Sequence, residues 1–296
     1  MVADKLNIGD TIGIISPSHI ATVENYANII SGIEAKGFHV KTGKNLYKST
    51  YGYLASETER ADDLNEMVLD EEVKLIFFGG GNGSIELLPY INYQNIAKHP
   101  KLFLSYSDGT SILNAIYSKT GLVTYYGQTP GEFAELQPYT YHQFSAHLLK
   151  QDAGSFVSNS KWYSLYKGVC EGILIGGYTL NFALSVNTEY LHIDKNKKYI
   201  LFLEDHERFN CVAAVSMLLS HIEQNWTMEN VAGLLFGNYS DTISNELLGR
   251  LTRFGERYHV PVAYCDDFGH GKNHAILPIG SSAILDTNNN SLQFIG

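Results

Sequence analysis

The chain has 296 residues, which at about 150 residues per domain predicts roughly two domains. Hydrophobic residues make up 44% and charged residues 18%, a composition that excludes a disordered chain or a coiled coil. The 31 acidic and 21 basic residues give a net charge of −10, and no run of like charges concentrates it. We therefore expect neither nucleic acid nor an anionic membrane as a partner, because phosphate binding needs clustered Lys and Arg.

The amino terminus and the cysteines indicate the compartment. Residues 1–10 have no apolar stretch behind a basic end, and no later stretch approaches the roughly 18 apolar residues of a membrane span. We therefore expect a cytoplasmic protein. The three cysteines, Cys170, Cys211 and Cys265, show no C-x-x-C spacing, as expected for thiols in a reducing compartment. The eleven histidines show no paired zinc spacing, so we expect no metal.

Strand and helix signals alternate through the first half of the chain. Apolar runs predict strands at 11–15, 38–41, 73–78, 102–104 and 122–125. Apolar residues at helical spacing predict helices at 23–35, 57–69 and 111–117. Strands separated by helices form right-handed βαβ units and a parallel sheet. The first half therefore predicts an α/β domain of Rossmann or flavodoxin type.

The alternation of strand and helix signals stops after Leu136. The polar and aromatic segment that follows is typical of a connection between domains. Further strands are predicted at 169–175, 199–203, 231–236 and 260–263, with short ones near 283–285 and 292–295. We predict an N-terminal α/β domain over 1–135, a connector over 136–167, and a smaller C-terminal α/β domain over 168–296.

A glycine-rich loop, Gly79–Ser84, directly follows the third predicted strand. Its glycines let backbone N–H groups face outward without Cβ obstruction, which suits an anion or a developing oxyanion. The loop lacks the G-K-[ST] ending and the G-x-G-x-x-G spacing of nucleotide-binding loops. A tight turn that packs a helix on the sheet is the structural alternative.

A second polar loop, Ser105–Thr110, follows the fourth predicted strand and precedes a helix. A serine at a sharp strand-to-helix turn is held clear of the sheet, and the amide of the next residue can help to stabilise an oxyanion. A serine or aspartate that only caps the helix is the structural alternative.

A hydroxyl nucleophile needs a base, and the base needs an orienting carboxylate. Glu204 and Asp205 end an apolar strand, although helix capping is an alternative role for them. His270 lies between Gly269 and Gly271, with little local packing of its own. The chain order Ser, Glu, His is compatible with acyl transfer.

Ordered motifs along the chain resemble those of the LD-carboxypeptidases and the related microcin C immunity peptidases. They include Gly9–Gly13 with Ser16–Ser18, Gly52–Ala55 with Arg60–Asn65, the Gly80-Gly81 pair with Leu87–Tyr90, Tyr106–Asp108, Gly172–Gly177, Leu201–Asp205, Phe268–His270 and Leu277–Gly280. No single motif is specific, but the resemblance covers nearly the whole chain in order.

The resemblance implies a serine peptidase with a Ser–Glu–His triad and no cofactor. Ser107 is expected to be the nucleophile, His270 the general base and Glu204 its orienting acid. The backbone amides of Gly81 and Asp108 are the expected oxyanion hole. The resemblance also implies a homodimer, and a triad divided between two domains that domain motion could gate.

Substrate contacts are expected from Gly80, Asn82 and Trp162. The substrate would be a murein LD-peptide or a peptidyl or aminoacyl nucleotide, cleaved at an amide next to a terminal residue. Five arginines could hold a substrate carboxylate, and their spacing does not select one: Arg60, Arg208, Arg250, Arg253 and Arg257.

Three positions depart from the family pattern. Ser105, two residues before the expected nucleophile, stands where members usually carry a glycine. Gly79 stands where murein-processing members often carry an arginine before the Gly-Gly pair. Tyr178 stands in place of the asparagine of a Gly-Gly-Asn motif in the second domain. The missing arginine and the Asn82–Ser84 stretch favour the immunity-peptidase branch. Two alternatives remain open at this level: an ordinary α/β-hydrolase with its triad on one sheet, and a two-domain binding protein without chemistry.

Overall fold

The computed structural model describes residues 1–135, 137–149 and 156–295. The chain divides into two compact units, Met1–Ala153 and Gly154–Gly296. The segment 136–167, predicted from the sequence to be a connector, instead contributes a helix to the first unit and a strand to the second. Residues 136 and 150–155 of that segment lie outside the described residues.

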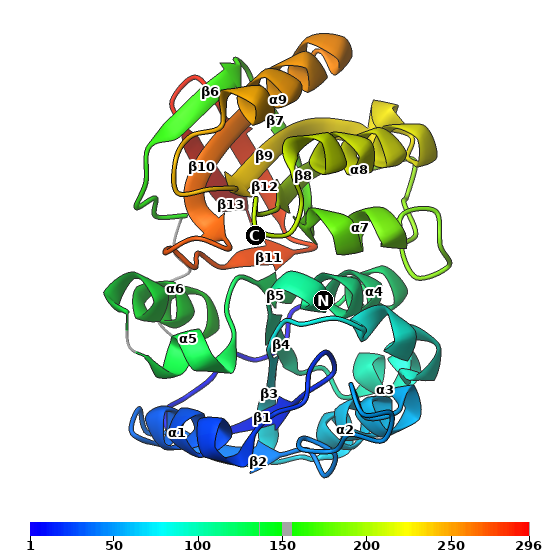
Figure 1. The fold of residues 1–296 in the computed structure, drawn as a ribbon, viewed down its shortest axis with the longest axis vertical. Helices are drawn as coiled ribbons and strands as arrows, with labels where there is room; N and C mark the ends of the chain where they lie inside the picture. Colours follow the sequence, from blue (N-terminus) through cyan, green and yellow to red (C-terminus); the bar gives the residue numbers. More distant parts are fainter. Residues whose placement is uncertain (136, 150–155, 296) are drawn as a thin grey trace. The chain divides into compact units, whose positions relative to one another are not determined.

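The first unit contains a parallel sheet whose strands lie in the order β5-β4-β3-β1-β2. The strands are β1 (Thr11–Ile15), β2 (His39–Thr42), β3 (Val73–Phe78), β4 (Leu102–Ser105) and β5 (Thr124–Tyr126). The helices are α1 (Val23–Glu34), α2 (Glu57–Leu69), η1 (Ser84–Tyr90), α3 (Tyr93–Lys98), η2 (Ser107–Gly109), α4 (Thr110–Thr120), α5 (Pro130–Ala134) and α6 (Pro138–Leu148). Figure 1 shows α1, α5 and α6 on one face of this sheet and α2, α3 and α4 on the other.

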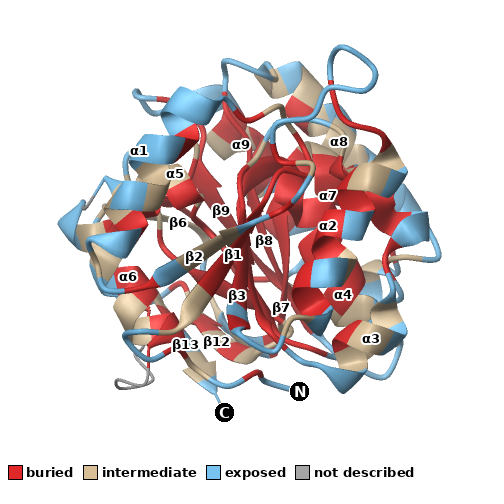
Figure 2. Ribbon diagram, turned by 90° about the horizontal axis from the view of Figure 1, so that it is seen from below, coloured by how far each residue is buried: buried red, intermediate tan, exposed pale blue. Residues whose placement is uncertain are grey.

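The core of the first unit lies at the sheet. All residues of β4 are buried, and in Figure 2 the central strands are red whereas the outer turns of α1 are pale blue. Each fully buried side chain of the size of Phe77 or Phe103 contributes about 1.5–3 kcal/mol of transfer free energy. The start of α2 is fixed by a capping box between Ser56 and Glu59. Because the strands are parallel, their carboxyl ends meet at one edge, where α/β proteins place their sites.

The second unit contains a mixed sheet in the order β13-β12-β7-β8-β9-β10-β6, with a parallel centre, β7 to β10. Its strands are β6 (Trp162–Tyr166), β7 (Val169–Tyr178), β8 (Tyr199–Glu204), β9 (Val231–Asn238), β10 (Val262–Gly269), β12 (Ser282–Asp286) and β13 (Ser291–Ile295), and a short strand, β11 (Leu277–Ile279), precedes β12. Its helices are α7 (Thr179–Ser185), α8 (Val212–Asn225), η3 (Met228–Asn230) and α9 (Asn245–Tyr258). The strands β6, β12 and β13 are antiparallel to their neighbours.

The predicted fold class is confirmed: an α/β unit with a parallel sheet precedes a smaller α/β unit with a mixed sheet. The sequence did not predict α6 or β6, both of which fall in the aromatic segment assigned to the connector. Across residues 1–135, 137–149 and 156–295, the structure has no helix long and apolar enough to cross a membrane.

Candidate active site

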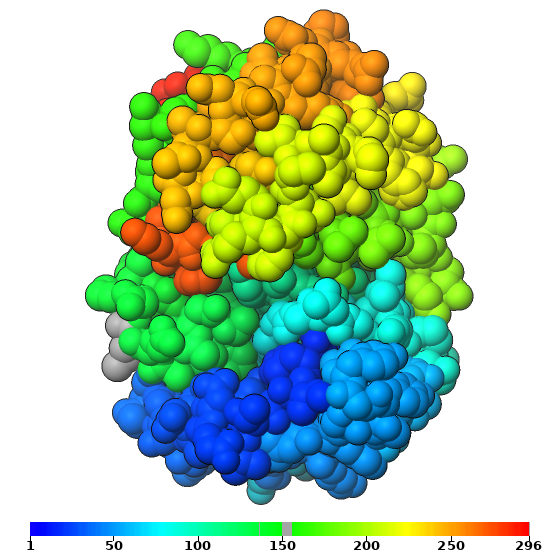
Figure 3. Space-filling view, in the orientation of Figure 1, coloured from blue at the N-terminus to red at the C-terminus, as the bar shows by residue number. Residues whose placement is uncertain are grey.

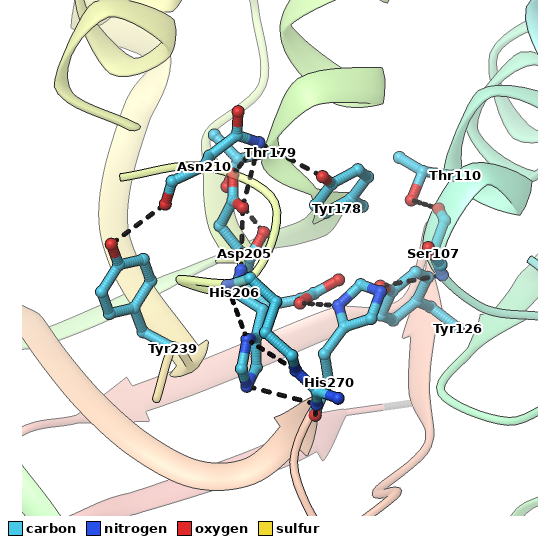
Figure 4. Close-up of polar contacts among 12 residues, drawn as sticks. Ser107, Thr110, Tyr126, Tyr178, Thr179, Asp205, His206, Asn210, Tyr239 and His270 are labelled. Carbon is cyan, nitrogen blue, oxygen red and sulfur yellow. Dashed lines mark hydrogen bonds and ion pairs between the residues drawn. The ribbon is translucent and has the colours of Figure 1, made fainter. Parts of the chain in front are cut away.

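Ser107 lies at a sharp turn between β4 and α4. Its φ of 55° is in the left-handed region, which is unusual for a residue with a Cβ and is found where surrounding contacts hold a strained site. Its N–H donates to the Tyr126 hydroxyl at 3.1 Å, and its C=O accepts from the Thr110 hydroxyl at 2.7 Å. These two contacts, drawn in Figure 4, fix the backbone on both sides of the serine. The predicted strand-to-helix turn is therefore present.

The glycine-rich loop packs directly against this turn. A Cβ at Gly80 would lie 2.7 Å from the Ser107 Cβ, so only glycine allows the backbone to come this close. Gly81 has a φ of 143°, and a Cβ there would overlap the Ser18 carbonyl. Asn82 is exposed, and its N–H donates to that carbonyl at 2.8 Å. The two loops singled out in the sequence thus form one site in the first unit.

The Asp108 side chain links the same two loops. Its carboxylate accepts the N–H of Ser84 at 2.8 Å, and its C=O accepts the Ser84 hydroxyl. Ser84 begins η1, which directly follows the glycine-rich loop. The carboxylate of Asp108 therefore holds the two loops together. The backbone amide of Asp108 is the group predicted to face an oxyanion.

Ser105, which replaces a glycine of the family pattern, is completely buried at the end of β4. Its hydroxyl has no hydrogen-bond partner among the described residues, and it fills the space where Gly109 lacks a side chain. A buried hydroxyl without a partner costs free energy.

We expect Ser105→Ala to raise the free energy of unfolding by about 1 kcal/mol, measured by urea denaturation. An unchanged or lower value would mean that the hydroxyl is satisfied.

Glu204 and His270 meet at the carboxyl ends of β8 and β10 in the second unit. The Nδ1 of His270 lies 2.8 Å from Glu204 Oε2, and Glu204 is completely buried. An ionised carboxylate only accepts hydrogen bonds, so Nδ1 carries the proton and Nε2 is left as the basic nitrogen. Gly269 has a φ of 102°, and a Cβ there would touch the Glu204 side chain. The glycine before His270 is thus required by this close approach.

Aromatic rings surround the imidazole of His270. The rings of Phe209 and Tyr178 meet it edge-on at centroid distances of 4.9 and 5.3 Å, and His206 lies at 6.4 Å. Figure 4 shows Tyr178 and His206 beside His270. Phe209 is 57% exposed, so one wall of this cage is open to a ligand. In the sequence, Tyr178 stands out only as a departure from a motif.

Arg208 lies against the same histidine. Its guanidinium Nη2 donates to the His270 carbonyl at 3.4 Å, and its Nε donates to the His206 Nδ1 at 3.3 Å. Burial and the nearby Arg208 charge lower the pKa of His206, so at neutral pH the ring is uncharged and places no second positive charge beside Arg208. Of the five arginines, this one places a cation beside the candidate base.

The other arginines have different surroundings. Arg60 is buried and bonds the carbonyls of Pro17 and Gly83 and the carboxylate of Glu86, which anchors the glycine-rich loop. A groove of about 530 Å³ between α8 and α9, which lie side by side at the surface in Figure 3, holds the remaining three. Its lining is Ser216, Ser220, Glu223, Arg250, Arg253, Glu256 and Arg257. Glu223 pairs with two of its arginines, which gives that groove a structural role.

Asp205 anchors the loop that carries Arg208 and Phe209. Its carboxyl group accepts the side-chain amide of Asn210 at 3.1 and 3.2 Å and the N–H of His206 at 2.8 Å. The same amide donates to the Tyr178 hydroxyl at 3.2 Å. Burial, reinforced by the neighbouring Glu204 charge, raises the pKa of Asp205 to about 7.

The raised pKa of Asp205 predicts a pH-dependent stability. The carboxyl group keeps its proton to a higher pH in the folded than in the unfolded chain, so its contribution is full below about pH 4 and is lost as the pH rises through about 7. Asp205→Asn has no proton to lose. We expect the fall in unfolding free energy between pH 5 and pH 8 to be smaller in this variant, measured by urea denaturation. Asp4→Asn, at an exposed site, is the control, and equal falls in wild type and Asp205→Asn would contradict the prediction.

The predicted substrate contacts differ in accessibility. Gly80 is partly exposed and Asn82 exposed at the first-unit site. Trp162, by contrast, is 7% exposed on β6, and its indole N–H donates to Asp267 at 2.9 Å and Ser158 at 3.0 Å. These contacts hold β6 against β10, and Trp162, although largely buried, stays a predicted substrate contact.

Within the described part of the chain, no group of three or more His, Cys, Asp or Glu side chains could hold a metal ion. The structure instead has a strained serine beside a glycine-rich loop in one unit, and a histidine oriented by a buried carboxylate in the other. On a two-unit α/β scaffold, this set of groups defines a serine hydrolase.

Comparisons with known proteins identify the family. The model of the LD-carboxypeptidase N-terminal domain matches residues 12–127, and that of the LD-carboxypeptidase C-terminal domain matches residues 171–285. A probable murein peptide carboxypeptidase of Bacillus subtilis is 30% identical, over 95% of this chain and 90% of the relative. The microcin C7 self-immunity protein MccF of Escherichia coli is 29% identical, over 99% of this chain and 95% of the relative.

Solved structures agree with this assignment. Wild-type MccF without ligand superimposes with a TM-score of 0.89 at 27% identity, over 100% of this chain and 98% of that one. An MccF-like protein of Bacillus anthracis gives 0.88 at 27% identity, over 100% and 99%. The chain belongs to the LD-carboxypeptidase family of serine peptidases, which includes the MccF proteins. An ordinary α/β-hydrolase and a binding protein without chemistry, the two alternatives from the sequence, do not fit this family.

Proposed function

We propose that Ser107, His270 and Glu204 form the catalytic triad of a peptidase that hydrolyses an amide next to a terminal residue. The observation that carries the proposal is the 2.8 Å contact between Glu204 and the Nδ1 of His270, which leaves Nε2 basic. The strained turn at Ser107 supports it from the other unit. In this proposal the triad is complete when the two units bring these side chains together.

The reaction follows from these roles. His270 Nε2 takes the proton of the Ser107 hydroxyl as the oxygen attacks the amide carbonyl, and Glu204 stabilises the imidazolium that forms. The backbone N–H groups of Gly81 and Asp108 stabilise the negative oxygen of the tetrahedral intermediate. The imidazolium then gives its proton to the leaving amine, and a water molecule activated by the same ring hydrolyses the acyl-enzyme.

For the substrate, we propose an aminoacyl or peptidyl nucleotide. Its phosphate-like linkage carries negative charge that suits Arg208, and its base offers a flat ring that suits the exposed Phe209; both side chains lie beside His270. MccF structures with aspartyl sulfamoyl adenosine and glutamyl sulfamoyl guanosine support this class. A murein LD-peptide is the second candidate, because Arg208 also suits a terminal carboxylate and one relative is a probable murein peptide carboxypeptidase.

A side-by-side hydrolysis assay tests the substrate class. We expect kcat/KM for a hydrolysable amide-linked aspartyl-adenylate mimic to exceed that for a murein tetrapeptide ending in D-alanine by at least about tenfold. The reverse ratio would assign the chain to murein peptides.

We further propose that the protein is a cytoplasmic homodimer. A mass of one copy, measured by light scattering of the purified chain, would contradict the dimer.

A further inference from the structure

His19 lies beneath the glycine-rich loop, in the turn that follows β1. Its Nδ1 lies 3.1 Å from the Gly80 carbonyl oxygen, and its Nε2 lies 2.7 Å from the Tyr26 hydroxyl on α1. The ring also faces Gly79, where a Cβ would lie 3.2 Å from the His19 Cε1. No motif or spacing in the sequence predicts a role for this histidine.

The partners of His19 define which ring nitrogen carries the proton. A carbonyl oxygen only accepts, so Nδ1 must donate to Gly80. In the neutral ring Nε2 then accepts from the Tyr26 hydroxyl, which can turn its proton toward it. Burial lowers the pKa of His19, so the ring is neutral at neutral pH and both contacts are satisfied.

The bond to the Gly80 carbonyl also fixes the direction of the Gly81 N–H. The two groups belong to one trans peptide unit, in which C=O and N–H point in opposite directions. With the carbonyl held toward His19, the Gly81 N–H points away from it and has no acceptor among the described residues. An amide donor that is held in place and left without an acceptor is what an oxyanion hole requires.

The rest of the loop has separate anchors. Asn82 N–H donates to the Ser18 carbonyl, and the Arg60 guanidinium donates to the Gly83 carbonyl at 3.0 Å. These contacts hold the path of the chain but leave the Gly80–Gly81 peptide free to rotate, because glycine offers little resistance to a peptide flip. Within the described chain, His19 is the group that holds this one plane.

We propose that His19 is a positioning residue for catalysis: its Nδ1–H holds the Gly80 carbonyl so that the Gly81 N–H faces the oxyanion. The proposal rests on the function proposed above, in which the Gly81 amide stabilises the tetrahedral intermediate. His19 acts through the peptide plane and transfers no proton to the substrate. Its loss therefore affects the transition state more than substrate binding.

Two substitutions of His19 test the contributions of Nδ1 and Nε2 separately. The amide nitrogen of His19→Asn can occupy the place of Nδ1 and donate to Gly80, whereas that of His19→Gln reaches the place of Nε2. Loss of one oxyanion donor costs about 10²–10³ in kcat, and misdirecting the donor should cost part of that. We expect kcat to fall about 10- to 100-fold in His19→Ala and His19→Gln, with KM nearly unchanged, and to stay within about threefold of wild type in His19→Asn.

The assay uses the full chain and whichever of the two substrates above is hydrolysed. A kcat within about threefold of wild type in His19→Ala would overturn the proposal, as would equal losses in His19→Asn and His19→Ala, or a loss that falls only on KM. If the His19 variants do not fold, Tyr26→Phe removes the hydroxyl bonded to Nε2, so that the ring is held by the Gly80 carbonyl alone; a fall in kcat alone supports the proposal and wild-type kcat overturns it. Ser107→Ala, assayed in parallel, tests the proposed function itself, since its failure would show as retained hydrolysis.

Discussion

Ser107→Ala is expected to reduce turnover by about 10⁴–10⁶-fold while the chain keeps its fold. The substitution deletes one oxygen at a turn and leaves the Cβ, so the strained φ of 55° is no more costly than before. The contacts to Tyr126 and Thr110 use backbone atoms of Ser107 and remain. Turnover would be measured with both candidate substrates, and folding by circular dichroism and thermal unfolding.

Ser105→Ala is the matched control for this experiment. It removes an identical hydroxyl two residues earlier, at a position that is completely buried and takes no part in the proposed chemistry. We expect activity within about threefold of wild type. Turnover of Ser107→Ala within about tenfold of wild type would exclude Ser107 as the nucleophile, and equal losses in the two variants would point to a packing effect.

The fold was predictable wherever apolar periodicity and chain order agree. Runs such as Val73–Phe78 and Tyr199–Glu204 are strands because they are buried on both faces, and their alternation with helices requires parallel pairing. The edge strand β6 and the helix α6 carry mixed polar and aromatic residues, so their patterns resemble a connection. Their structure depends on tertiary packing, which a local pattern does not contain.

The site was predictable only where residues follow the ends of strands. Ser107, Glu204 and His270 each lie within two residues of the end of a buried strand, and the contact between Glu204 and His270 joins two strand ends that are 66 residues apart. Nothing in the sequence indicates a role for His19, and no spacing singles out Arg208 from the other four arginines. Their roles come from contacts with carbonyl groups that lie 61 residues from His19 and 62 residues from Arg208. No local spacing encodes such partners.

His270→Ala is expected to reduce hydrolysis to a small residual rate, whereas His274→Ala should change little beyond substrate affinity. Both histidines lie between β10 and β11, but the Nδ1 of His270 is the one bonded to the buried Glu204. The base works while its ring is neutral, so wild-type activity should rise with pH as the ring loses its second proton. Glu204→Gln should lower the rate strongly with the fold intact, because a side-chain amide can favour the wrong tautomer of the ring.

The pH–rate profile shows which histidine is the base. We expect the acidic limb of kcat/KM to persist in His274→Ala, and the residual activity of His270→Ala to show no such limb. If His274→Ala instead abolishes the reaction while His270→Ala spares it, the base is His274 and the contact between Glu204 and His270 is structural. A limb that persists in the residual activity of His270→Ala would likewise exclude His270 as the titrating base, because no proton acceptor remains at that position.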